Sequence, residues 1–302
     1  MDWESWLRSA ADAPSKTEDS KRDRTESQIK DALAKSSALQ GRPYRVYVKG
    51  SYANNTNVRL DYDVDVAVQY EGYFYSDLYF ELSGQSKASV GVVDSDDPYT
   101  RTQFKNDIKA ALEEAFGESA VTAGNIAYRV REEKTTLPAD VVPSWDYRRY
   151  DGRTANGSPF FQQGSRIFPE SGGHTDNYPD QQKSNGVAKN LRTNYRYKYM
   201  VRAMKKLHTD LDEKGLITEP LPSYFIECLV YNVPDDKFGN STYRADARAI
   251  LATMFNETLS NGNWNDWEEV NGLKYLFRGK QPWTHEQSHQ FADAAWDEIG
   301  FD

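Results

Sequence analysis

The sequence predicts an α+β fold with two lobes, in which a mixed sheet with helices is followed by a lobe of helices. Three observations predict it. Alternation of apolar and polar residues, typical of strands, is confined to the first half of the chain. Amphipathic helical spacing occurs in both halves, and beyond about residue 187 it occurs without strand-like segments. A long stretch rich in Gly, Ser, Asn, Pro and Gln separates the two halves.

The first half is expected to combine helices with strands. Residues 15–38 are mostly charged or small, with Ile29 and Leu33 spaced as i and i+4, which predicts a largely solvated helix. Residues 50–57 and 71–100 are rich in polar and small residues, so we expect surface loops there. The other expected elements are strands at residues 44–49, 63–69, 126–130 and 137–142 and a helix at residues 104–116.

The second half is expected to be mainly helical. Residues 150–186 are dense in Gly, Ser, Asn, Pro and Gln and are interpreted as a loop that contains the lobe boundary. The sequence therefore predicts an amino-terminal lobe at residues 1–165, beginning with a helix, and a helical lobe at residues 166–302.

The composition is that of a globular protein, with 38% hydrophobic and 27% charged residues. A net charge of −9 excludes a general attraction to nucleic acids or anionic membranes. The single cysteine, Cys228, excludes an intramolecular disulfide, and its apolar neighbours predict a buried core residue. The amino terminus is too polar for a signal peptide and no apolar run reaches about 18 residues, so we expect a soluble, cytoplasmic protein.

Two aspartates close together on a predicted strand are the sharpest chemical signal. Side chains two residues apart on a strand point to the same face, so Asp63 and Asp65 project together while Val64 and Val66 face the core. Adjacent carboxylates repel each other unless a cation lies between them, and magnesium prefers such oxygen ligands. A solvated strand edge is the alternative explanation of the pair.

A third aspartate lies in an apolar, strand-like run. Asp140 stands between Ala139 and Val141, where an unpaired buried carboxylate would be costly. An ion pair with Arg129 or Arg131 is one explanation. The other is a site in which three acids from two neighbouring strands hold two magnesium ions about 3.5–4 Å apart. Phosphoryl transfer at such a site depends on positioning and electrostatics and needs no nucleophilic side chain.

Two segments are candidates for binding phosphate. Gly50 and Ser51 directly follow a predicted strand, where glycine lets backbone N–H groups approach an anion and serine adds a hydroxyl donor. The run from Lys183 to Lys206 has eight basic residues and no acidic one. A solvated cationic helix face is the usual explanation of such a run, but acids normally accompany it. Within the run, one helix face carries Lys198, Arg202 and Lys205.

A later helix is predicted to start at Pro222-Ser223-Tyr224. Ser223 is a candidate helix cap, and its hydroxyl and the free N–H groups could instead meet a phosphate. Tyr224 could stack on a base or pack in the core. These alternatives stay open on the residues alone.

The combination of these segments resembles the polymerase-β-like nucleotidyltransferases. More closely, five stretches look like the bacterial branch of the cyclic GMP-AMP synthase and oligoadenylate synthase group, called CD-NTases. The resemblance runs from about residue 20 to the carboxyl terminus. The stretches are GSYANNTNVRLDYDVDVAV, ADVVPSW, NGVAKN, VRAMKKL and PSYFIECLVYNVP.

The resemblance implies a site in the cleft between the lobes and a role for each candidate residue. Asp63, Asp65 and Asp140 would bind two Mg²⁺ ions, which Mn²⁺ can replace. Family members join nucleoside triphosphates, with release of pyrophosphate, into cyclic di- or trinucleotides that activate a separate effector in anti-phage defence. The donor triphosphate would be held by Gly50, Ser51, Lys205 and Ser223, with a base stacked on Tyr224.

Two further expectations follow from comparing this chain with the family. Asn185, in Ser184-Asn185-Gly186, is a candidate for the base pocket, where its amide would suit a pyrimidine edge. The Asn-Gly pair is also a common turn signal. The chain has no His/Cys zinc insertion, so activation by double-stranded DNA is not expected.

Two other functions remain open on the sequence. One is a transferase that adds a nucleotide to a protein, an RNA or a small molecule; the net charge of −9 argues against a long RNA acceptor. The other is a nucleotide-binding module without catalysis. Retention of all three acids beside the Gly-Ser turn argues against that module.

Overall fold

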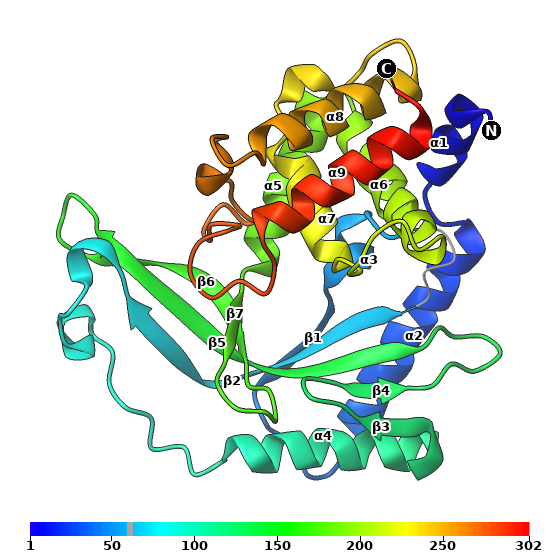
Figure 1. Cartoon of the computed structure of the whole chain (residues 1–302). Coiled ribbons are helices and arrows are strands. Elements are labelled where there is room, and N and C mark those ends of the chain that lie inside the picture. The colour runs from blue at the N-terminus through cyan, green and yellow to red at the C-terminus, as the bar shows by residue number, and fades with distance from the viewer. Residues whose placement is uncertain (59–62, 302) are drawn as a thin grey trace. The chain divides into compact units, whose positions relative to one another are not determined.

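The computed structural model describes residues 1–58 and 63–301, and the chain forms two compact units (Figure 1). The sheet unit comprises Lys16–Lys49 and Tyr62–Pro179. The helical unit comprises Met1–Ser15, Gly50–Asp61 and Asp180–Asp302. This division differs from the single boundary expected after residue 165, because the sheet continues further and two early segments pack with the carboxyl-terminal helices.

The sheet unit contains a mixed sheet, as expected, with seven strands among the described residues. Its strand order is β1-β2-β5-β4-β3, and β6 pairs with β5 and β7. Strands β2 and β5 are parallel, and the other pairs are antiparallel. The strands are β1 (Tyr44–Val48), β2 (Val64–Leu78), β3 (Val121–Ala123), β4 (Tyr128–Val130), β5 (Ala139–Arg153), β6 (Pro159–Ile167) and β7 (Thr175–Asn177).

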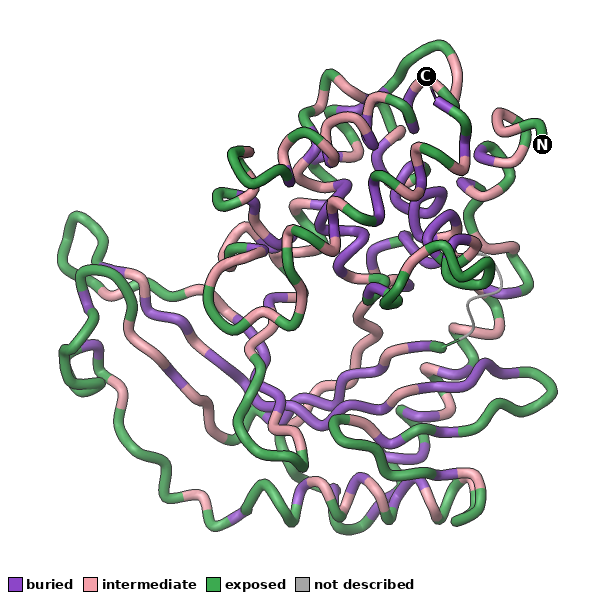
Figure 2. The backbone as a smooth tube through the Cα atoms, in the orientation of Figure 1, coloured by how far each residue is buried: buried purple, intermediate pink, exposed green. Residues whose placement is uncertain are grey.

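One face of this sheet is covered by two helices, α2 (Lys16–Lys35) and α4 (Arg101–Phe116). Their apolar stripes, which include Ile29 and Phe104, are fully buried, as are the alternate β2 residues Val64 and Val66. Figure 2 shows this buried middle of β2 and β5. The pleat therefore leaves the intervening residues of β2 and β5 on the opposite face.

Helix α4 has sequence signals at both ends. Thr100 caps its amino terminus and forms a capping box with Gln103, and Gly117 follows its last residue with φ +87°. The helix expected at residues 104–116 is therefore confirmed and begins one turn earlier.

Three of the loop predictions are wrong in part, because the segments contain strands or helices. Strand β2 continues to Leu78, and residues 150–186 contain the end of β5, all of β6 and β7, and the start of α5. The β5–β6 hairpin turns at Gly157 (φ +84°), and consecutive polar residues in its strands interrupt the apolar alternation. The expected loop at residues 50–57 contains a short helix, α3 (Gly50–Asn54).

The helical unit is built around one apolar cluster. Leu7 of α1 joins it, which explains why the amino terminus belongs to this unit. Cys228 is fully buried, as expected. No helix in the described part of the chain is long and apolar enough to cross a membrane. The helices are α1 (Trp3–Ala10), α5 (Pro179–Arg192), α6 (Arg196–Glu213), α7 (Ser223–Asn232), α8 (Tyr243–Glu257) and α9 (His285–Ile299).

Candidate active site

The strand register aligns four charged residues in one row across the sheet unit. Asp65 of β2 lies directly opposite Asp140 of the parallel strand β5. On the other side of β2, the backbone N–H of Lys49 donates to the backbone carbonyl of Asp65 (2.9 Å). On the other side of β5, Arg129 of β4 is the register partner of Asp140. Two adjacent carboxylates are therefore flanked by two cations on neighbouring strands.

The electrostatics of the row show that the carboxylate of Asp140 is not fully compensated. Burial raises the pKa of Asp140, the Asp63 carboxylate raises it further, and Arg129 and Lys49 oppose the shift. Burial lowers the pKa of Lys49, and Asp65 and Asp140 oppose that shift. An additional cation beside Asp140 would therefore be stabilised.

Asp63 pairs with Arg129. The Nη2 of Arg129 lies 3.1 Å and 3.2 Å from the two carboxylate oxygens of Asp63, and both side chains are about half exposed. The ion pair considered between Arg129 and Asp140 is thus not the contact that forms, since Asp63 accepts this hydrogen bond. Exposed pairs of this kind contribute only about 0–1 kcal/mol, so a cation can compete for Asp63.

The donor chemistry of these acids fits magnesium. All three offer carboxylate oxygens, and the register brings Asp65 beside Asp140 with the Asp63 charge close enough to affect it. Among the described residues they are not drawn together as tightly as a second group, Asp77, His174 and Asp176. The ligand atoms of that group lie within 4.8 Å of one another, so it could also hold a metal ion.

The two carboxylates of the Asp77, His174 and Asp176 group are already paired with a cationic side chain. Arg166 is buried and pairs with both carboxylates, with 2.6 Å separating its Nε from Asp176. Tyr147 donates to Asp77 as well (3.2 Å). A metal ion there would have to displace a guanidinium group, whereas the row at Asp65 and Asp140 holds two adjacent acids.

Gly50 and Ser51 begin helix α3 in the helical unit. Gly50 has φ +69°, a backbone conformation that glycine adopts at little cost. Its carbonyl accepts a hydrogen bond from the Asn54 side chain (2.9 Å), and the Ser51 carbonyl accepts one from the Thr56 N–H (2.9 Å). Because both carbonyls are engaged inside the turn, the conformation of residues 50–56 is closely defined.

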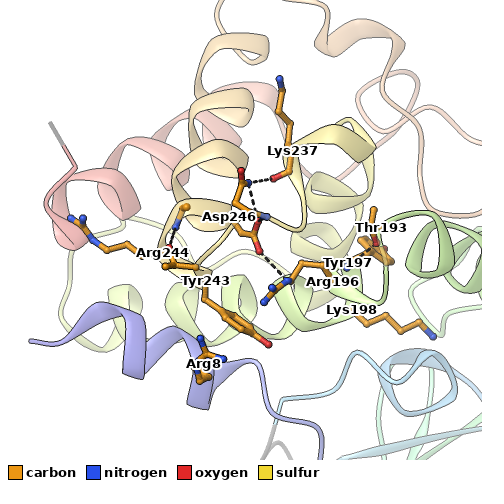
Figure 3. A network of polar contacts seen from close by, with 12 residues as sticks. Arg8, Thr193, Arg196, Tyr197, Lys198, Lys237, Tyr243, Arg244 and Asp246 are labelled. Carbon is orange, nitrogen blue, oxygen red and sulfur yellow. Dashed lines mark hydrogen bonds and ion pairs between the residues drawn. The ribbon is translucent and has the colours of Figure 1, made fainter.

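The basic run from Lys183 to Lys206 is not a solvated cationic face. Figure 3 shows one of its contacts, in which Arg196 points toward the buried Asp246 (3.1 Å). Arg202 is also buried and donates to the Asn55 carbonyl (2.7 Å). The acids missing from the run come from outside it. The ion pairs are Lys189 and Arg192 with Asp235, Arg196 with Asp246, Lys205 with Glu227 and Lys206 with Asp210.

Lys205 lies in a buried polar contact. Its Nζ is 3.0 Å from Glu227 and donates to the Thr56 carbonyl (3.1 Å). Lys205, Glu227 and Thr56 are each at most 4% exposed. The residue expected to meet a triphosphate is therefore linked to the segment that starts at Gly50.

Ser223 and Tyr224 open helix α7, as expected. Ser223 does not cap it, because the capping position is Pro222, which makes no side-chain cap hydrogen bond. Tyr224 is half-buried, donates to Glu269 (3.0 Å) and packs edge-on against Trp283. Part of its ring is thus engaged in packing.

Asn185 lies on α5, not in a turn. Its side-chain Nδ2 donates to the Val270 carbonyl (2.9 Å). Gly272 packs close above it, since a Cβ there would lie 3.2 Å from the same nitrogen. The hydrogen bond to the Val270 carbonyl therefore fixes the orientation of the Asn185 amide, including the position of its oxygen.

Lys49 and Glu227 were not predicted as site residues. Lys49 directly follows β1 and pairs with Asp65 in continuation of the β1–β2 register. The pairing of the two predicted strands could therefore have identified it. Glu227 is the one acid in the apolar run Phe225–Val230, and a buried acid in such a run indicates a specific partner.

Comparisons with known proteins agree with this architecture. Residues 184–300 match the cGAS/DncV-like nucleotidyltransferase C-terminal helical domain. A cyclic dipyrimidine nucleotide synthase CdnE from Legionella pneumophila is 38% identical over 99% of this chain and 98% of its own length. One from Cecembia lonarensis is 32% identical over the same shares.

The fold is also similar to that of a solved structure. The Rhodothermus marinus CdnE c-UMP-AMP synthase with Apcpp and Upnpp has a TM-score of 0.82 and 33% identity, covering 99% of this chain and 98% of that one. Both the identity and the coverage exceed what a shared fold alone requires. The chain therefore belongs to the family of CdnE cyclic nucleotide synthases, a group of cGAS/DncV-like nucleotidyltransferases.

Proposed function

We propose that this enzyme joins two ribonucleoside triphosphates, at least one of them a pyrimidine, into a cyclic dinucleotide with release of pyrophosphate. The observation that carries the proposal is the pairing of Asp65 with Asp140 across parallel strands, between Lys49 and Arg129. The family relationship supports the reaction class. The relatives named as dipyrimidine and UMP-AMP synthases support a pyrimidine substrate.

Asp63, Asp65 and Asp140 are the proposed ligands of two magnesium ions, with manganese as a substitute. When bound, such ions favour deprotonation of the attacking ribose hydroxyl and stabilise the departing pyrophosphate. Lys49 and Arg129 limit the repulsion around Asp140, and the buried valines of β2 face away from Asp65.

The donor triphosphate is proposed to bind Gly50 and Ser51, whose N–H groups and hydroxyl are suited to an anion. The covalent bond between Lys49 and Gly50 joins this turn to the end of β1, beside Asp65. Ser223 is proposed as a further donor to the phosphates. Lys205 is proposed to contribute through its contacts in this segment.

The bases are proposed to contact Tyr224 and Asn185. Tyr224 is only half-buried, which supports stacking of a base on it. An oriented amide at Asn185 can accept from, and donate to, the edge of a pyrimidine. The product is proposed to activate a separate effector in anti-phage defence. Because the substrates are nucleoside triphosphates, we propose the cytoplasm as the location.

The experiment is an incubation of the enzyme with all four ribonucleoside triphosphates, labelled at the α-phosphate, with magnesium or manganese. After phosphatase treatment, mass spectrometry identifies the resistant product. A cyclic dinucleotide containing uridine or cytidine supports the proposal. Label transferred to an added protein or small molecule, or absence of turnover, would contradict it.

A further inference from the structure

A buried carboxylate on α7 contacts the segment that follows Gly50 and Ser51. Glu227 is 2% exposed and lies among apolar residues. Its Oε2 accepts hydrogen bonds from Thr56 Oγ1 (2.6 Å) and Lys205 Nζ (3.0 Å). Its Oε1 accepts one from Gln182 (3.3 Å). Three donors from different parts of the helical unit thus converge on one acid.

Two hydrogen bonds connect Glu227 to the turn at Gly50 and Ser51. Thr56, which is 1% exposed, donates its hydroxyl to Glu227, and its backbone N–H donates to the Ser51 carbonyl (2.9 Å). Lys205 holds the Thr56 carbonyl (3.1 Å). Both the side chain and the backbone of Thr56 are therefore determined by the buried pair.

Stability alone does not account for a buried ion pair at this position. Removing two charges from water is unfavourable, and apolar residues of similar volume often stabilise a fold as well or better. A satisfied buried polar network does, however, select one conformation of the groups that it contacts. Here those groups belong to the segment from Gly50 to Thr56.

We propose that Glu227 is a positioning residue, which acts through Lys205 and Thr56 to hold the Gly50–Thr56 segment in the conformation that receives the donor triphosphate. This inference rests on the proposed function. It gives Lys205 an indirect role and explains why its ammonium group lies between Glu227 and Thr56.

The test compares Thr56→Val, which keeps the shape and removes the hydroxyl, with Thr56→Ser, which retains it. We expect Thr56→Val to raise the KM for the triphosphate and the Kd for α,β-methylene ATP about tenfold, with kcat changed about twofold or less, as for a lost ground-state contact. Thr56→Ser should restore values close to those of the wild-type enzyme. Equal KM and Kd in Thr56→Val and the wild type would overturn the inference.

Glu227→Gln and Asp246→Asn form a matched pair of variants. Asp246 is also fully buried and ion-paired in the helical unit, with Arg196, but it has no described contact with residues 50–56. We expect Glu227→Gln to raise KM about tenfold, and Asp246→Asn to lower thermal stability while leaving KM unchanged. A similar rise of KM in both variants would mean that Glu227 only stabilises the fold.

A double-mutant cycle gives an independent criterion. Because Thr56 and Glu227 act in one network, Thr56→Val combined with Glu227→Gln should raise KM no more than either change alone. Combined with Asp246→Asn, the Thr56→Val effect should be unchanged. Multiplicative effects of Thr56→Val and Glu227→Gln would overturn the inference. If Glu227→Gln does not fold, the Thr56 series decides alone.

Failure of the inference is distinguishable from failure of the proposed function. A wild-type enzyme that makes a cyclic dinucleotide, with variants of unchanged KM, contradicts only the positioning role. A wild-type enzyme without turnover and without binding of α,β-methylene ATP contradicts the function itself.

Discussion

Asp65 and Asp140 are direct register partners on the parallel strands β2 and β5. Like charges placed opposite each other in a sheet are destabilising, and the pKa of Asp140 is raised by burial and by Asp63. This arrangement therefore lowers the stability of the fold. Binding of cations, as proposed above, would relieve the repulsion.

The first prediction concerns the acids. Changing both Asp63→Asn and Asp65→Asn should lower turnover by about 10³-fold or more, since loss of several kcal/mol of charge stabilisation has that effect. The thermal midpoint should remain equal or rise, because repulsion with Asp140 is relieved. Product assays and thermal unfolding measure the two quantities. Unchanged turnover would rule out the metal assignment.

The second prediction concerns Arg129, which pairs with Asp63. A guanidinium group competes with metal ions for the same carboxylate, so Arg129→Ala should lower the manganese concentration for half-maximal activity. A pair worth roughly 0.6 kcal/mol corresponds to about a threefold change. Arg131→Ala, which removes the same charge nearby on the chain, is the control. Equal metal dependence in the two variants would show that the contact is irrelevant to metal binding.

The fold was predictable where periodicity was strong. Helix α4 has four apolar residues at intervals of four, and the valines of β2 alternate with polar residues, so both were expected. The β5–β6 hairpin was missed because consecutive polar residues, Arg148-Arg149 in β5 and Gln162-Gln163 in β6, interrupt the alternation of its strands. Cross-strand pairs such as Tyr150 with Phe161 stabilise it, and these become visible only in the register.

The candidate site was predictable to the extent that it is local. Asp63 and Asp65 are two residues apart in the sequence and were expected together on one strand, although β2 begins only at Val64. The partners of Lys205 could not be predicted in the same way. Glu227 is 22 residues away on another helix and Thr56 is 149 residues away. Helix or strand periodicity does not relate residues at such separations. The sequence therefore did not reveal which acids pair with the basic run.

The third prediction concerns pH and stability. His208 is buried, its Nε2 accepts a hydrogen bond from the Leu221 N–H (2.8 Å), and burial lowers its pKa, with Asp212 opposing. The folded state therefore favours neutral histidine. This contribution is fully present above the unfolded pKa near 6.5 and is lost as the pH falls toward the lower folded value.

The corresponding variant is His208→Gln, whose amide can still accept the Leu221 N–H and does not titrate. Thermal midpoints measured between about pH 5 and 8, the range around an ordinary histidine pKa, should fall less on acidification in His208→Gln than in the wild type. Parallel curves for the two proteins would mean that other groups cause the acid sensitivity.

The last prediction concerns base selection at Asn185, whose amide is oriented by the Val270 carbonyl. Asn185→Ala should lower incorporation of pyrimidines relative to purines by about tenfold to 100-fold, since a paired base contact is worth roughly 1–3 kcal/mol. Gly272→Ala should produce part of this change, because its Cβ would lie 3.2 Å from the Asn185 nitrogen at φ +65°. The exposed neighbour Ser184→Ala is the control. Competition between UTP and ATP, read by mass spectrometry, measures the ratio; a ratio equal in all four proteins would exclude Asn185 from the base pocket and leave pyrimidine selection to other residues.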